Sequence, residues 1–159
     1  VYATSGPRIA LRFHASAGPG GLSCEGPAPG SRTGKAVPMG GMLNAAGRSP
    51  EFRIEATADK APIARIEIVK GETRKGDFRE TVETVWTREG GGTHACVIWK
   101  DKAFDRGEGV FWYPRVIEVP TPRWSAVHCR REGKCAEFPG ADRTIEERAW
   151  GSPIWYAPG

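Results

Sequence analysis

The chain has 159 residues, with 23 Lys and Arg against 19 Asp and Glu, so the formal net charge is +4. A hydrophobic fraction of 39% and six Trp are enough for a core, which argues against disorder as the main state. No apolar run approaches the roughly 20 residues of a membrane helix, and the glycines lack the three-residue period of collagen. The 21 Gly and 13 Pro interrupt helices and favour short strands joined by turns.

Alternating apolar residues predict strands in the first half of the chain. Residues 8–14 place Ile9, Leu11 and Phe13 on one face. Residues 16–49 are rich in Gly and Pro and predict a long loop insertion, from which the apolar residues of 36–42 dock on the core. Residues 52–56 and 64–70 then alternate on either side of a turn at 59–62, which predicts an antiparallel pair.

Strands are also predicted in the second half. Residues 81–86 and 94–100 flank Gly90–Gly92 and predict another antiparallel pair, although the three glycines are also able to form an anion nest. The longest candidate strand covers residues 110–119. Pro114 within it lacks a backbone donor, which predicts an edge position or a bulge.

The last part of the chain is less regular. Thr144 and Glu147 have the spacing of a capping box, which predicts one or two helical turns over residues 144–150. Residues 152–156 are apolar and predict an edge strand. Six or seven strands with little helix predict an all-β, immunoglobulin-like antiparallel β-sandwich, with residues 1–159 forming a single domain with long Gly/Pro-rich loops.

The histidines and acidic residues show no complete metal-binding motif. His14, His94 and His128 are far apart, and a metal site requires the fold to bring two of them together. Asp101, Asp105 and Glu108 offer carboxylates for calcium, but their spacing does not match the twelve-residue calcium loop, and a solvated loop is the alternative. The sequence therefore predicts neither catalytic nor metal-binding residues in this chain.

Two patterns indicate possible binding surfaces. Arg123, Arg130, Arg131 and Lys134 form the densest basic patch, beside Trp124, but Glu132 dilutes its charge, so no nucleic-acid partner is expected. The alternative is that Trp124 packs inward while the charges face water. A row of exposed Trp would indicate carbohydrate stacking, whereas the strand positions of three Trp favour the core; these are Trp86, Trp99 and Trp112.

Four cysteines are compatible with disulfides and an oxidising compartment. Cys129 and Cys135 enclose a short polar loop, so a bond between them is geometrically plausible. Cys24 and Cys96 would then tie the long early loop to a strand. Since four cysteines allow three pairings, this pairing is a preference.

Eight segments, ordered along nearly the whole chain, carry a family resemblance; they are residues 2–9, 38–41, 65–71, 97–101, 104–105, 111–118, 120–125 and 145–156. Together they resemble the C-terminal part of an uncharacterised family of exported bacterial PHP-like metallohydrolases, a family defined by a domain of unknown function. In that family an N-terminal barrel carries the His, Asp and Glu metal ligands, and none of them maps onto this chain. The resemblance therefore implies no cofactor here and a divalent metal in a preceding barrel. It also implies export to the periplasm or the exterior.

We therefore expect a non-catalytic accessory domain whose partner is the catalytic barrel of the same protein. Its docking surface, or the substrate entrance it shapes, should include the turn at residues 4–8 and the corner at residues 120–124, with Arg8, Arg123 and Trp124 as candidate residues. Two prolines stiffen that corner. The alternative is a free-standing carbohydrate-binding or interaction module, which would need coplanar exposed rings.

Overall fold

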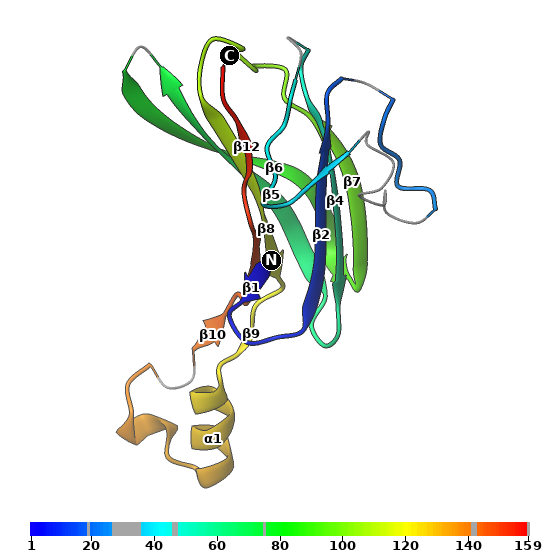
Figure 1. Ribbon diagram of the computed structural model, residues 1–159. Coiled ribbons are helices and arrows are strands. Elements are labelled where there is room, and N and C mark those ends of the chain that lie inside the picture. The colour runs from blue at the N-terminus through cyan, green and yellow to red at the C-terminus, as the bar shows by residue number, and fades with distance from the viewer. Residues whose placement is uncertain (19, 27–35, 46–47, 75, 141–142, 159) are drawn as a thin grey trace.

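A computed structural model of the chain describes residues 1–18, 20–26, 36–45, 48–74, 76–140 and 143–158. Two antiparallel sheets pack face to face (Figure 1), which confirms the all-β sandwich. The six-stranded sheet has the order β1 (Tyr2–Thr4), β11 (Arg148–Gly151), β8 (Val110–Glu118), β5 (Ile63–Arg74) and β6 (Asp77–Gly92), and β12 (Ile154–Tyr156) also pairs with β8. The four-stranded sheet has the order β3 (Val37–Pro38), β2 (Ile9–Ser16), β4 (Glu51–Ala58) and β7 (His94–Lys100).

The core lies between the sheets and contains the apolar residues that alternate in the sequence. Ile9, Leu11 and Phe13 of β2 are all buried. Phe52 of β4 contacts both Phe13 and Trp112 of β8, with ring centroids 5.5 Å and 5.0 Å away. Burial of such rings is a major contribution to stability, so Trp112 belongs to the core as expected.

Both predicted antiparallel pairs are wrong. β4 pairs with β2 and β7, while β5 pairs with β6 and β8. The turn at residues 59–62 therefore crosses from one sheet to the other, and so does the segment between β6 and β7. Alternation defines the inward face of a strand, but it does not identify the neighbour that supplies the backbone hydrogen bonds.

Pro114 does not lie on an edge strand, because β8 has partners on both sides. It pairs with Ile68 of β5 on one side. On the other side of β8, Pro114 lies between two partner strands. β11 pairs with β8 as far as Arg115, and β12 begins opposite Trp112. A Cβ at Gly151 would lie 2.8 Å from the Pro114 ring, so glycine is required beside the proline.

The helical turns predicted over residues 144–150 are also wrong. Thr144–Ile145 forms β10, which pairs with β9 (Thr121–Pro122), and β11 follows. Pairing of β11 with β8 and β1 outweighs the local capping signal, and it buries Ala149. The segment predicted as an edge strand is β12, as expected.

Helix occurs instead between β9 and β10. It consists of α1 (Trp124–Glu132) and the 3-10 turn Cys135–Glu137. α1 ends at Gly133, whose left-handed φ of 67° suits glycine. Among the described residues, no helix has the length and apolar character needed to cross a membrane.

Candidate functional site

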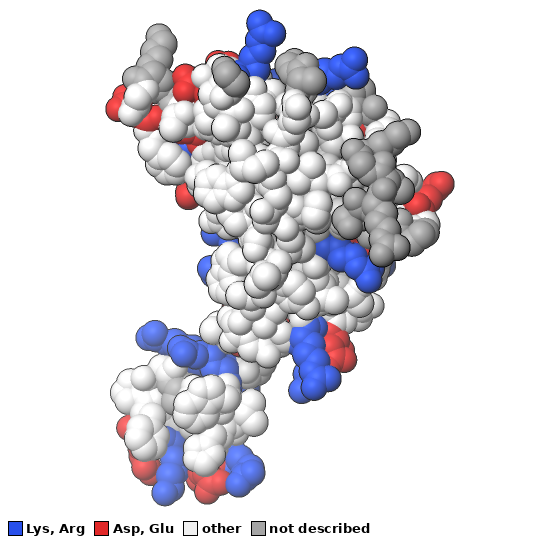
Figure 2. Space-filling model, in the orientation of Figure 1, with Lys and Arg blue, Asp and Glu red and all other residues white. Residues whose placement is uncertain are grey.

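Residues 120–140 and 143–145 leave the sandwich and form a separate lobe, which we call the protrusion. The strands β9 and β10 form its stalk, and α1 and the 3-10 turn form its tip (Figure 1). The space-filling view shows the lobe beyond a narrow neck (Figure 2). A disulfide between Cys129 and Cys135 closes the tip, as the sequence predicted.

The protrusion has almost no core of its own. Within α1 only Ala126 and Cys129 are buried. Trp124 is 79% exposed, and Val127 and Phe138 are each 58% exposed. The alternative in which Trp124 packs inward is therefore wrong. Such a concentration of exposed apolar residues on a small lobe is typical of an interaction surface.

The protrusion also carries charged side chains of both signs (Figure 2), and most of those among its described residues are basic. Arg123 precedes α1, where its backbone N–H donates to the Arg143 carbonyl at 3.1 Å and joins the two sides of the stalk. Arg130, Arg131 and Lys134 are exposed on the tip. An apolar centre with a charged rim is the usual arrangement of a protein–protein interface.

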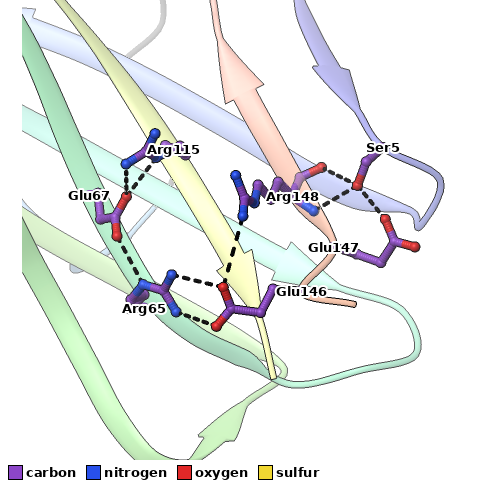
Figure 3. A network of polar contacts seen from close by, with 7 residues as sticks. All are labelled: Ser5, Arg65, Glu67, Arg115, Glu146, Glu147 and Arg148. Atoms are coloured by element: carbon purple, nitrogen blue, oxygen red, sulfur yellow. Dashed lines mark hydrogen bonds and ion pairs between the residues drawn. The ribbon is translucent and has the colours of Figure 1, made fainter. Parts of the chain in front are cut away.

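The stalk is fixed to the sandwich by Glu146 and Glu147, which connect β10 to β11 (Figure 3). Glu146 accepts two hydrogen bonds from Arg65 of β5, at 2.8 Å and 3.1 Å. Such bidentate pairing gives both strength and a defined orientation. The Ser5 hydroxyl donates to the Glu147 carboxylate and accepts the Arg148 backbone N–H at 2.8 Å. The base of the protrusion is therefore held by the sheet and by the turn at residues 4–8.

The same network continues across the sheet to Glu67, which accepts hydrogen bonds from Arg65 at 2.9 Å and from Arg115 at 2.6 Å. Burial alone raises the pKa of Glu67, but the two guanidinium groups outweigh this and lower it overall. The hydrogen bonds from Arg65 likewise lower the pKa of Glu146. Both carboxylates therefore remain charged, and the network intact, across the neutral range.

Arg8 lies at the same end of the sandwich as the stalk. The turn that contains it lines an open hollow of about 590 Å³ together with Ile9, Thr57 and Asp59. The turn also contacts the stalk base through Ser5. The two segments predicted for docking, residues 4–8 and 120–124, are thus connected in the structure through Ser5 and Glu147.

The structure does not bring the candidate metal ligands together. Among the described residues, no group of three or more His, Cys, Asp or Glu is placed to hold a metal ion. His14 lies on β2 and His128 on α1, while His94 lies 3.4 Å from Glu55. Desolvation, followed by the charge of Arg53, lowers the pKa of His14.

The calcium alternative fails because Asp101 is already engaged elsewhere. Asp101 is buried and lies 3.0 Å from the ammonium group of Lys70, which also pairs with Glu72 at 2.9 Å. Trp112 donates its indole N–H to Asp101 at 3.0 Å. These charges line a cavity of about 130 Å³ between the sheets. This cluster was not predicted from the sequence, although Lys70 and Glu72 continue the inward alternation of β5.

Glu118 is a buried carboxyl group beside the stalk, and no hydrogen-bond partner is found for its Oε1 among the described residues. Burial, followed by the charge of Glu147, raises its pKa. A raised pKa means that the folded state favours the neutral acid, so stability is lost as pH rises through that pKa. We expect Glu118→Gln to increase the free energy of unfolding at pH 7 by about 1 kcal/mol. Urea titrations at pH 7 and below pH 4 measure this.

The gain should disappear at the acidic pH, where Glu118 is neutral in both states. Glu132→Gln is the control, because Glu132 is an exposed carboxylate on the protrusion. It should change stability little at either pH. An equal increase in the free energy of unfolding at both pH values would contradict the conclusion that the buried charge of Glu118 destabilises the fold at pH 7.

The sandwich, its two disulfides and the anchored protrusion define a β-sandwich domain with an exposed lobe. The model of a family described as protein of unknown function (DUF3604) matches residues 1–90 and 80–158. The chain therefore belongs to this family. No curated protein and no solved structure matches it.

Proposed function

We propose that the chain is the non-catalytic C-terminal accessory domain of a larger, exported PHP-like metal-dependent hydrolase. It packs on the catalytic barrel of the same protein and shapes the substrate entrance. The observation that carries this proposal is the protrusion, a lobe with little core that exposes Trp124, Val127 and Phe138 on a fixed stalk. A surface of this kind is stabilised by a partner that covers it. Two disulfides are compatible with export.

The residues at the stalk suggest how docking and orientation are coupled. Trp124 is the anchor that would enter a pocket of the barrel, since Trp is enriched among residues that dominate interface energies. Arg123, set between Pro122 and Trp124, would pair with a barrel carboxylate or with an anionic substrate. Arg8 would extend the surface on the sandwich side. The divalent metal would belong to the barrel, as the resemblance implies.

A binding experiment between this chain and the separately produced remainder of the protein tests the proposal. Trp124→Ala should weaken the complex by about 2 kcal/mol, close to 30-fold in Kd. Isothermal titration calorimetry measures this loss. Because Trp124 is exposed, its replacement should leave the Tm of the isolated chain nearly unchanged.

Trp155→Ala is the matched control, because it removes another exposed Trp ring, from β12 instead of the protrusion. It should leave the Kd unchanged. Cross-linking adds a direct readout, since Lys134 is the only lysine in the protrusion. It should cross-link to the remainder of the protein. Two results would contradict the proposal. One is phosphoester hydrolysis by this chain alone with added divalent metal. The other is a native source protein whose intact mass equals the mass of this chain.

A further inference from the structure

An aromatic surface lies on the face of the six-stranded sheet that points away from the core. Phe111 and Tyr113 are alternate residues of β8 and therefore share one face. The register places Trp155 of β12 opposite Phe111, and Phe78 of β6 opposite Thr73 in the adjoining row. We call Phe78, Phe111 and Tyr113 the platform. Phe78 is 62% exposed, and Trp155 beside the platform is 45% exposed.

The platform rings are nearly parallel. The planes of Phe78 and Phe111 differ by 18°, with centroids 6.2 Å apart. The planes of Phe111 and Tyr113 differ by 15°, with centroids 6.3 Å apart. Trp155 is tilted by 51° from Phe111 at 5.1 Å and stands as a side wall. The three rings therefore form one aromatic cluster on this sheet face.

Gly71 allows the central ring to lie against the sheet. Its register partner is Phe111, and a Cβ on Gly71 would overlap three carbons of the Phe111 ring. The ring therefore lies across the backbone of β5. Any other residue at position 71 would push the ring outward. Phe78 and Tyr113 have nearly the same ring orientation as Phe111.

Polar groups of both signs border the platform. Glu80 of β6 lies opposite Gly71 in the register and is exposed. Burial raises the pKa of Tyr113, and the charge of Glu80 raises it further. The charge of Arg115 acts in the opposite direction. Arg115 is itself held by Glu67. A border with both signs and no basic groove does not suit a polyanion such as a nucleic acid.

We propose that the platform binds a neutral polysaccharide. The apolar C–H faces of successive pyranose rings would stack on Phe78, Phe111 and Tyr113, while Glu80 and the Tyr113 hydroxyl would bond to the sugar hydroxyls. An apolar surface with a few polar groups at its border is the usual composition of a small-ligand site. This site lies on the sheet face and is separate from the protrusion, so it does not depend on the docking proposed above.

Retention of the whole chain on insoluble cellulose, chitin and xylan tests the proposal. We expect measurable retention of the unmodified chain on at least one of them. Phe78→Ala and Tyr113→Ala should each reduce the affinity for that polysaccharide about 5- to 10-fold. Both changes remove rings at the surface, and an unchanged Tm shows that a lost affinity is not lost folding.

Trp124→Ala is the matched control, because it removes an exposed ring from the protrusion and should leave retention unchanged. No retention on any of the three polysaccharides overturns the proposal. An equal loss with Trp124→Ala, or complete displacement by single-stranded DNA, does so too. If Phe78→Ala leaves retention unchanged but weakens binding to the remainder of the protein, the platform belongs to that interface and binds no polysaccharide.

Discussion

Loss of the disulfide between Cys24 and Cys96 is expected to lower the free energy of unfolding by about 4 kcal/mol. The bond closes a segment with a sequence separation of 72 residues, so its loss greatly increases the freedom of the unfolded chain. It also pins the early loop across β4, where the Ser23 carbonyl accepts a hydrogen bond from buried Arg53 at 2.7 Å. Guanidinium unfolding of the double variant Cys24→Ser/Cys96→Ser measures the loss.

The second disulfide supplies the matched control. Cys129 and Cys135 are only six residues apart, and their bond lies in the protrusion. The double variant Cys129→Ser/Cys135→Ser should leave the unfolding transition of the sandwich within about 0.5 kcal/mol while increasing protease cleavage of the protrusion. Equal destabilisation of the sandwich by both double variants would show that the protrusion and the sandwich unfold as one unit.

Replacement of Asp101 by Ala is expected to destabilise the fold by about 3–5 kcal/mol. Asp101 accepts hydrogen bonds from Trp112 and from the Ala103 backbone and pairs with Lys70. All three donors would lose this partner, and Trp112 is fully buried in the core. Urea unfolding followed by tryptophan fluorescence measures the change.

Asp105→Ala is the control in the same loop. Asp105 is exposed and accepts one backbone hydrogen bond, from Gly107 at 2.9 Å. Its replacement should cost about 0.5–1 kcal/mol. Similar losses from the two substitutions would mean that the loop as a whole, and not the buried ion pair, stabilises this end of the sandwich.

The protrusion and the platform are two separate surfaces of one rigid domain. The network around Glu146 fixes the first, and the backbone beneath Phe111 fixes the second. Both depend on the six-stranded sheet, because Arg65 and Gly71 belong to the same strand, β5. The docking surface and the polysaccharide site that we propose would therefore both depend on this one strand.

The sequence by itself predicted the longer strands of the sandwich and their inward faces, and it favoured the disulfide pairing that the structure shows. Ile9, Leu11 and Phe13 occupy alternate positions because successive side chains of a strand point to opposite faces. This two-residue period can be read from the sequence whichever strands are neighbours in the sheet. Local signals were sufficient for these features.

Only the tertiary structure decided which strands pair and which side chains meet. The predicted strand pairs were wrong because backbone hydrogen bonds between strands do not depend on the identity of the side chains. A turn such as residues 59–62 can therefore connect strands in two different sheets as well as neighbouring strands of one sheet. The capping signal at Thr144 gave way to pairing with β9. Lys70 meets Asp101, and Phe78 meets Phe111, across long separations along the chain. Such contacts exist only once both sheets are assembled.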